Sequence, residues 1–236
     1  MDQQPYTLEI PVDHPATAEA VAPFVTRVEV CAQLDQHGFT PSTELVKSIC
    51  RALMGRCACT VLIRPNDSET MQVSPLAMDS AQRAIALLAG TGASAAAFGF
   101  LNQHHQLDHS SNAKLANFCR EHNIEPCLHR AFDFHEQLED AVALAADLGV
   151  IRVLSAGAPS LDQNHFPLDL RTERLKQIVF AADHRFQVIA AGGVRGKNAT
   201  QFLSCTPHLH ASCRTKQKLS PNELYELLSV LNNVVS

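Results

Sequence analysis

Charged and imidazole side chains alternate with apolar residues in several short runs of this sequence. The runs TLEIPV, RVEVC, PCLHRAFD and PHLHAS show this pattern most clearly. Successive side chains of a β-strand point to opposite faces, so the polar members of each run would share one face. If the apolar members pack under a layer of helices, the polar ones point into a common interior. The candidate residues of this interior are Glu9, Glu29, Arg64, His129, Asp133 and His210.

Carboxylate, imidazole and guanidinium groups in one pocket are the components of general acid–base chemistry on an anionic substrate. In this interpretation a glutamate, Glu9 or Glu29, is the base, and a histidine, His129 or His210, is the acid. Arg64 would bind the carboxylate or phosphate of the substrate. No lysine falls on an inward strand position, which argues against Schiff-base chemistry.

The alternative is a structural ion network. Charges taken out of water must be paired or must change their protonation. Pairs of Glu29 with Arg27 and of Asp133 with His129 would achieve this in an oversized interior. The ligand pocket is favoured because catalytic groups of parallel barrels lie at the carboxyl ends of the strands, where several of these residues fall. Arg130 has the opposite parity to His129, so the pattern leaves open whether it only packs between strand and helix.

A glycine pair provides a second signal for an anion. Gly192 and Gly193 follow an apolar run and precede Arg195. Glycines let the backbone approach a ligand closely, and free N–H groups at a helix start can bind an anion. Parallel barrels often bind phosphate after their seventh and eighth strands. We therefore predict an anion site at Gly192, Gly193 and Arg195, with a simple turn as the alternative.

Eight short apolar runs must position these residues, and helical segments separate them. The expected strands cover residues 7–12, 27–31, 59–65, 95–101, 126–133, 150–156, 186–192 and 207–212. Strands that alternate with helices indicate a parallel sheet, because a parallel connection needs a crossover. Eight units in 236 residues average about 30 residues each. The predicted fold class is α/β, a single-domain (β/α)8 TIM-type barrel over residues 1–236.

A doubly wound open sheet is the competing fold. It would usually bring a glycine-rich turn after its first strand, where this chain has residues 13–15, DHP. Helix starts are expected at Ser74-Pro75 and Ser220-Pro221, where a capping residue precedes a proline. The longest segment without periodicity, residues 157–170, follows the sixth strand and would hang over the carboxyl face of a barrel.

Two cysteines are candidate metal ligands. Cys31 and Cys213 end the second and eighth strands, which both neighbour the first strand, so their sulfur atoms could meet at the rim. Two thiolates suit Cu(I), and the alternative is a pair of buried apolar cysteines. Cys57 and Cys59 lie at the start of a strand and are interpreted as packing residues. The sequence contains no CxxC, HExxH or EF-hand motif.

Composition narrows the classes of partner. The net charge is −5, and no stretch gathers five or six like charges, so we expect neither a nucleic-acid nor a membrane partner. The amino-terminal residues lack the basic and apolar regions of a secretory signal. The eight cysteines are then interpreted as reduced thiols of a cytoplasmic protein.

Seven motifs resemble, in order, those of the CutC family of copper homeostasis proteins. They are RVEVC (27–31), TPS (40–42), IRP (63–65), HRAFD (129–133), RVLS (152–155), GGVR (192–195) and HAS (210–212), and HRAFD is the most specific. The resemblance implies a TIM-type barrel, a cytoplasmic homodimer or homotetramer, and copper handling with Cu(I) binding. It implies no established enzymatic reaction. The family's RPRGG run is RPNDS at residues 64–68 of this chain. The resemblance therefore supports the barrel fold more strongly than it supports the identity of the ligand.

Three hypotheses follow for function. The first, taken from the resemblance, is copper homeostasis with Cu(I) bound through Cys31, with Cys213 as a second ligand. The second is an enzyme of aldolase, isomerase or lyase type that acts on a small anionic metabolite, which can carry phosphate. The third is a non-catalytic scaffold. Cu(I) prefers soft ligands, whereas glutamate is hard and arginine repels a cation, so most of the inward residues suit the anionic metabolite better.

Overall fold

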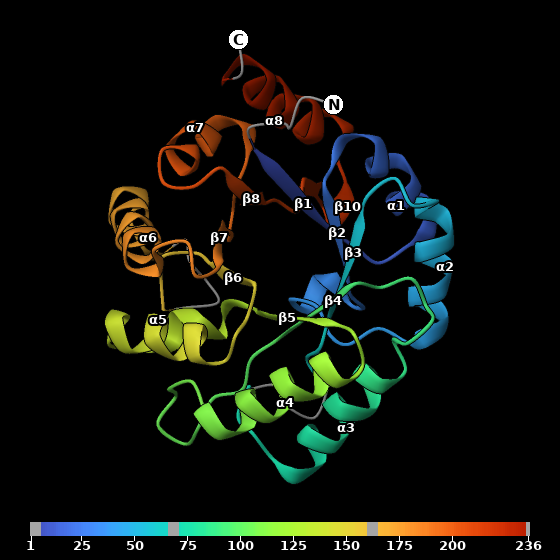
Figure 1. The fold of residues 1–236 in the computed structure, drawn as a ribbon. Helices are drawn as coiled ribbons and strands as arrows, with labels where there is room; N and C mark the ends of the chain where they lie inside the picture. The colour runs from blue at the N-terminus through green and yellow to red at the C-terminus, as the bar shows by residue number, and fades with distance from the viewer. Residues whose placement is uncertain (1–5, 66–70, 160–164, 235–236) are drawn as a thin grey trace.

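The computed structural model describes residues 6–65, 71–159 and 165–234. Eight parallel strands pair in chain order and close into a barrel, which confirms the predicted (β/α)8 architecture (Figure 1). The strands are β1 Thr7–Val12, β2 Arg27–Val30, β3 Ala58–Leu62, β4 Ala95–Phe98, β5 Glu125–Leu128, β6 Arg152–Ser155, β7 Gln187–Ala190 and β8 His208–His210.

Helices surround the strands on the outside of the barrel (Figure 1). They are α1 Pro15–Val21, α2 Thr43–Leu53, α3 Pro75–Ala86, α4 His109–Glu121, α5 Leu138–Asp147, α6 Leu168–Ala182, α7 Ala199–Leu203 and α8 Pro221–Val234. Short 3-10 helices are η1 Ala22–Phe24, η2 Leu34–Gln36, η3 Arg130–Phe134 and η5 Gly196–Asn198. A small hairpin, β9 Arg214–Thr215 and β10 Lys218–Leu219, was not expected from the sequence.

The two predicted helix starts are confirmed by their caps. Ser74 Oγ accepts a hydrogen bond from the Ala77 N–H at 3.0 Å, and Pro75 opens α3. Ser220 Oγ accepts one from the Glu223 N–H at 3.3 Å, and Pro221 opens α8. Each hydroxyl satisfies an N–H that has no partner inside its helix.

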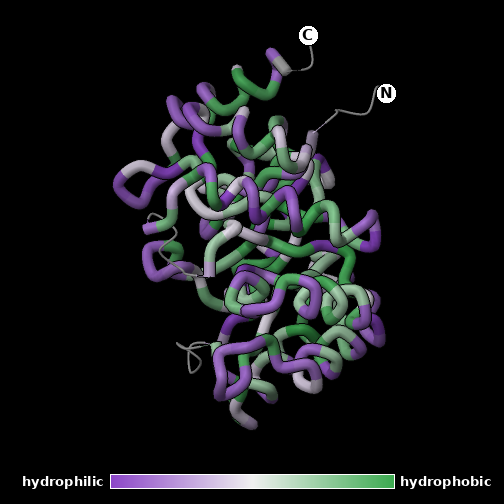
Figure 2. The backbone as a smooth tube through the Cα atoms, turned by 90° about the vertical axis from the view of Figure 1, so that its left-hand side faces the viewer, coloured by the Kyte–Doolittle hydropathy of each residue, from purple (hydrophilic) through white to green (hydrophobic). Residues whose placement is uncertain are grey.

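The main core lies between the strands and the helices. Leu8, Ile10 and Val12 of β1 are fully buried there, as their alternation predicts. In Figure 2 the outer turns and loops are largely hydrophilic and the hydrophobic stretches run through the middle. Glu9 of β1 and Glu29 of β2 are also buried, but on the side of the barrel axis. The axis therefore holds charged groups that the fold must neutralise or use.

The fifth strand ends earlier than the sequence pattern suggests. β5 stops at Leu128, and η3 begins at Arg130. The turn forms because His129 Nδ1 accepts a hydrogen bond from the Ala131 N–H at 3.1 Å, a local bond that competes with strand pairing. Strand parity no longer applies beyond His129, so the inward and outward assignment of the HRAFD motif changes.

In the part of the chain that the structure describes, every helix is too short or too polar to cross a bilayer.

Candidate functional site

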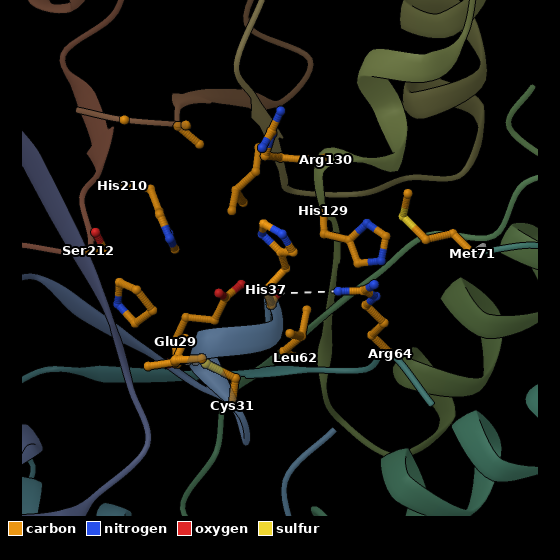
Figure 3. Close-up of a pocket in the computed structure, with 16 residues that line it drawn as sticks. Glu29, Cys31, His37, Leu62, Arg64, Met71, His129, Arg130, His210 and Ser212 are labelled. Carbon is orange, nitrogen blue, oxygen red and sulfur yellow. Dashed lines mark hydrogen bonds between the residues drawn. The ribbon is translucent and has the colours of Figure 1, made fainter. Parts of the chain in front are cut away.

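A cavity of about 540 Å³ opens at the carboxyl ends of the barrel strands (Figure 3). This volume is within the range of small-molecule sites. The structure brings seven of the predicted site residues to its lining: Glu29, Cys31, Arg64, His129, Gly192, Gly193 and His210. Four others, Glu9, Asp133, Arg195 and Cys213, are not part of the lining.

Glu9 lies beneath the cavity and holds His210. The strand register places Glu9 level with Arg27 of β2 and with His210 of β8. Its Oε1 is 2.8 Å from His210 Nδ1, and its Oε2 is 3.1 Å from Arg27 Nε. Burial alone would raise the pKa of Glu9, but His210 and Arg27 lower it to about 2. Because an ionised carboxylate only accepts hydrogen bonds, His210 Nδ1 must carry the proton, which leaves Nε2 as the second ring nitrogen of a cavity-lining side chain.

Glu29 is the exceptional group of the cavity. Its side chain points into the space between His210 and Arg64 in Figure 3, and only 6% of its surface is exposed. Its Oε1 has no hydrogen-bond partner among the described residues. Burial raises the pKa of this carboxyl to about 7, against an opposing effect of the His210 charge. Glu29 is therefore poised to exchange a proton near neutral pH.

His129 is a neutral hydrogen-bond donor. Burial lowers its pKa to about 3, and the Arg64 charge adds to this effect. Since Nδ1 accepts the Ala131 N–H, the ring proton resides on Nε2. A Cβ at Gly99 would lie 2.9 Å from two atoms of the His129 ring, so this position of the ring depends on a glycine.

Two guanidinium groups reach the cavity (Figure 3). Arg64 donates to the carbonyl oxygens of His37 at 3.4 Å and Gly38 at 3.1 Å, and it lies 4.9 Å above the Phe39 ring. Arg130 is 3.5 Å from the Asp133 carboxylate. The two cations make the mouth attractive to an anion. The sequence pattern left the role of Arg130 open, and η3 is what directs it to the cavity.

The glycine pair adds backbone donors. Gly192 and Gly193 have φ of +77° and +81°, values that favour glycine, and both line the cavity. Their N–H groups donate to no acceptor within the described residues. Buried Arg171 fixes this segment because its guanidinium donates to the carbonyl oxygens of Ala191 and Gly192. The segment is thus a rigid turn whose N–H groups are available to a ligand.

The position of Asp133 differs from the one that the sequence pattern predicts. It was expected in the pocket, but it lies in η3, fully buried and outside the cavity lining. Its carboxylate accepts hydrogen bonds from Ser155 Oγ and from the Ala156 N–H at 2.8 Å. Asp133 therefore ties η3 to the end of β6, and its pairing with His129 is replaced by an ion pair with Arg130.

Arg195 was also expected to bind an anion, and it is placed differently. Its guanidinium is 3.3 Å from the Glu223 carboxylate and donates to Ser212 Oγ at 3.1 Å and to the Val194 carbonyl oxygen at 2.9 Å. It lies outside the cavity lining, whereas Ser212 is part of it. Arg195 thus positions Ser212 and connects the glycine turn to α8, a role that only the tertiary structure reveals.

The two predicted rim thiols differ in their relation to the cavity. Cys31 lines the cavity, but Cys213 is buried outside the lining, with a left-handed φ of +46°. Burial raises the pKa of Cys213 to about 11 and, together with the Glu29 charge, raises that of Cys31 as well. The environment therefore favours protonated thiols at both positions.

One group among the described residues could hold a metal through three side chains: Glu9, Glu29 and His210, whose ligand atoms lie within 4.8 Å of one another. Both Glu9 oxygens are already engaged, one by His210 and one by Arg27. The guanidinium groups at the mouth add positive charge. The arrangement thus suits proton transfer better than cation binding.

Several lining residues were missed by the sequence patterns. His37 and Met71 lie in loops after β2 and β3, where alternation gives no information. The long segment expected after the sixth strand falls partly outside the described residues, at 160–164. Its carboxyl end is shorter than expected because α6 begins at Leu168.

Comparison with known proteins identifies the family. Residues 6–215 match the model of the CutC family. The chain belongs to the CutC family. A CutC family protein of Agrobacterium fabrum is 31% identical over 219 residues, covering 90% of this chain and 81% of the relative. Another, from Caulobacter vibrioides, is 30% identical over 202 residues, covering 84% and 77%.

Solved structures agree on the fold of this CutC family chain. A CutC protein of Streptococcus agalactiae, named for copper homeostasis, superposes with a TM-score of 0.78 at 19% identity, covering 91% of this chain and 100% of its own. A thiamine phosphate pyrophosphorylase of Pyrococcus furiosus gives 0.64 at 14% identity, covering 99% and 98%. At these identities the likeness shows the barrel fold alone.

Proposed function

We propose that the cavity binds a small anionic metabolite and transfers a proton within it. The observation that carries the proposal is the Glu29 carboxyl, which is buried without a hydrogen-bond partner for Oε1 among the described residues and has a pKa of about 7. A buried carboxyl in this state is costly unless a ligand uses it. Arg64 and Arg130 supply the charge that an anion requires.

The residues have complementary tasks in such a reaction. Ionised Glu29 takes a proton from the ligand carbon beside a carbonyl group, and the His129 Nε2–H donates to the oxygen that becomes negative. His210, held by Glu9, returns a proton through Nε2. The guanidinium of Arg64 and the Gly192 and Gly193 N–H groups bind the carboxylate or phosphate. This is chemistry of the aldolase, isomerase or lyase type.

Thermal-shift screening with phosphorylated and carboxylated metabolites tests the proposal. A ligand at 100 times its dissociation constant should add about 2.7 kcal/mol to the stability of the wild type. The double variant Glu29→Gln, His129→Asn should lose this shift. His208→Asn is the matched control, because His208 lies in a groove at the other end of the barrel. A hit that persists in the double variant would exclude this site.

Copper is the second candidate, and one observation favours it. The thiol of Cys31 lines the same cavity as Met71 and three histidines, all of which are soft or borderline ligands. The high pKa of the thiol and the two nearby guanidinium groups oppose a Cu(I) thiolate there. Cu(I) binding through Cys31, with Cys213 as second ligand, therefore fits the mouth less well than an anion does. Anaerobic Cu(I) titration of Cys31→Ser against a bathocuproine-type competitor tests it, and unchanged binding would exclude this role.

We also propose a cytoplasmic homo-oligomer, a dimer or tetramer, as the family resemblance implies. Support comes from eight cysteines that are all free, as expected in a reducing compartment. The outer side of α6 exposes Phe180 (87%) and Leu170 (61%), apolar surface that a second copy could cover.

A further inference from the structure

Hydrogen-bond donors for an anion lie on two opposite walls of the cavity. The strands close into a barrel in chain order, so the segments after β3 and β7 face each other across the barrel axis. Arg64 follows β3, and the turn of Gly192 and Gly193 follows β7. Neighbouring strands lie about 4.8 Å apart, which makes an eight-stranded barrel about 15 Å across. A single carboxylate or phosphate is too small to bind at both walls.

The wall at β7 and β8 presents neutral donors. The N–H groups of Gly192, Gly193 and Val194 donate to no acceptor among the described residues, although Val194 is fully buried. Unpaired buried N–H groups are rare in folded proteins, so this turn lacks an acceptor that a ligand can supply. Ser212 follows β8 and accepts a hydrogen bond from Arg195 Nη1 at 3.1 Å, which leaves its own O–H for a ligand in the cavity. Several donors on a turn and a hydroxyl suit the tetrahedral oxygens of a phosphate.

The wall at β3 presents a guanidinium. Arg64 is held on its own side of the cavity, because it donates to the carbonyl oxygens of His37 and Gly38 in the segment after β2. Figure 3 shows Arg64 and Ser212 on opposite sides of the cavity, with Glu29 between them. The planar N–H groups of a guanidinium match the two oxygens of a carboxylate. The two walls therefore suit different anionic groups.

The space between the walls suits a carbon chain. Pro11 of β1, Leu62 of β3 and Leu154 of β6 give the lining apolar side chains. Glu29 lies in the same space, and its Oε1 has no hydrogen-bond partner in the described part of the chain. Ligand atoms of Glu29 and His210 lie within 4.8 Å of each other, so both side chains can act on one carbon. A ligand held at both ends presents an interior carbon to this pair.

We propose that the ligand carries two anionic groups joined by a short carbon chain, a phosphate bound by the turn after β7 with Ser212 and a carboxylate bound by Arg64. This inference rests on the proposed function and narrows it from a small anionic metabolite to a phosphorylated carboxylic acid. Glu29 faces the carbons between the two groups, so proton transfer takes place within the chain of the ligand and not at its ends.

Calorimetric titration with matched phosphonates tests the two subsites. Phosphonopropionate and phosphonobutyrate carry a phosphonate and a carboxylate at opposite chain ends, whereas propylphosphonate and butylphosphonate end in a methyl group. At least one carboxylated probe should bind the wild type at least tenfold more tightly than its methyl-ended match. Arg64→Met should abolish this advantage and lower the affinity of the methyl-ended probes by less than about threefold.

Arg56→Met is the matched control. Arg56 also donates to two carbonyl oxygens, those of Ala52 and Leu53, but it lies outside the cavity lining, so this variant should keep the advantage. Equal affinities of carboxylated and methyl-ended probes for the wild type overturn the inference and leave the anion site of the proposed function standing. An advantage that survives in Arg64→Met also overturns the inference. Absence of binding by all four probes overturns both proposals.

NMR of the wild type avoids dependence on how the variants fold. Butylphosphonate should shift the amide resonances of Gly192 and Gly193 and leave the Nε–H resonance of Arg64 in place, whereas phosphonobutyrate should shift all three. No response of Arg64 to phosphonobutyrate overturns the inference. A response of Arg64 alone to butylphosphonate overturns it as well, because the phosphonate then occupies the wall assigned to the carboxylate.

Discussion

Glu29 and His129 line one cavity, and burial favours the uncharged form of both side chains. The pKa of Glu29 rises to about 7 and that of His129 falls to about 3, so an acid and an imidazole are both uncharged just below neutral pH. Glu9 differs because His210 and Arg27 hold it ionised. Neighbouring groups of this barrel end are therefore held at widely separated pKa values, as acid–base sites require.

The pKa of Glu29 has a consequence for stability. It is raised from 4.5 to about 7 in the folded protein, so the folded state binds more protons than the unfolded state in this interval. The stabilising contribution is present below pH 4.5 and is lost as the pH rises through about 7. Glu29→Gln should gain stability relative to the wild type over this interval, as measured by urea unfolding across the pH range. A difference that is constant with pH would contradict the assignment.

At the scale of elements, η3 decides which residues reach the cavity. It turns Arg130 toward the mouth and Asp133 toward β6, where Ser155 and Ala156 donate to the carboxylate. This connection lies outside the cavity lining, so we expect its main effect to be on stability.

Removal of the Asp133 carboxylate should therefore destabilise the fold. Asp133→Ala leaves two buried donors without an acceptor and should cost about 3 kcal/mol in the free energy of unfolding. Asp147→Ala is the control, since Asp147 pairs with His109 on the surface and should change stability by less than about 1 kcal/mol. Equal effects of the two variants would argue against the buried connection.

Gly99, in the segment after β4, leads to a prediction about the position of the His129 ring. Gly99→Ala would bring a Cβ within 2.9 Å of the His129 ring and 2.7 Å of the Ala131 Cβ, so the ring must move. We expect at least a tenfold loss of ligand affinity in the screening assay. Gly55→Ala, with no atom within 4 Å of the added Cβ but a φ of +70°, should cost about 1 kcal/mol of stability and leave affinity unchanged. The reverse order of affinities would contradict the account.

Features set by local sequence could be predicted, whereas features that depend on tertiary contacts could not. All eight strands and the inward position of Glu29 and His210 were predictable, because alternation within a strand is local. The turn after Leu128 was not, since it depends on a side-chain hydrogen bond of His129. The partners of Arg195 were equally hidden, because Ser212 and Glu223 reach it only through the closed barrel.

At the scale of the whole molecule, net charge and local charge have opposite signs. The chain carries −5, yet the cavity presents Arg64 and Arg130 at its mouth. An anionic ligand is therefore attracted to the cavity mouth and repelled by the net negative charge of the whole protein.

The exposed apolar side of α6 leads to a prediction about oligomerisation. If a second copy covers it, light scattering should give a mass that is a multiple of 25.7 kDa. Phe180→Asp should shift the protein toward the monomer, while Tyr225→Asp, an equally conspicuous exposed aromatic on α8, should not. A wild type that is monomeric at every concentration would exclude the oligomer.

The ionisation of Glu29 beside an anion site is the central claim, and carbon-13 NMR titration of the glutamate carboxyls tests it most directly. The account predicts one carboxyl with a pKa near 7 that is missing in Glu29→Gln, and this pKa should rise further when inorganic phosphate is added, because a bound anion repels the carboxylate. A spectrum in which every glutamate apart from Glu9 titrates near 4.5, with or without phosphate, would contradict it.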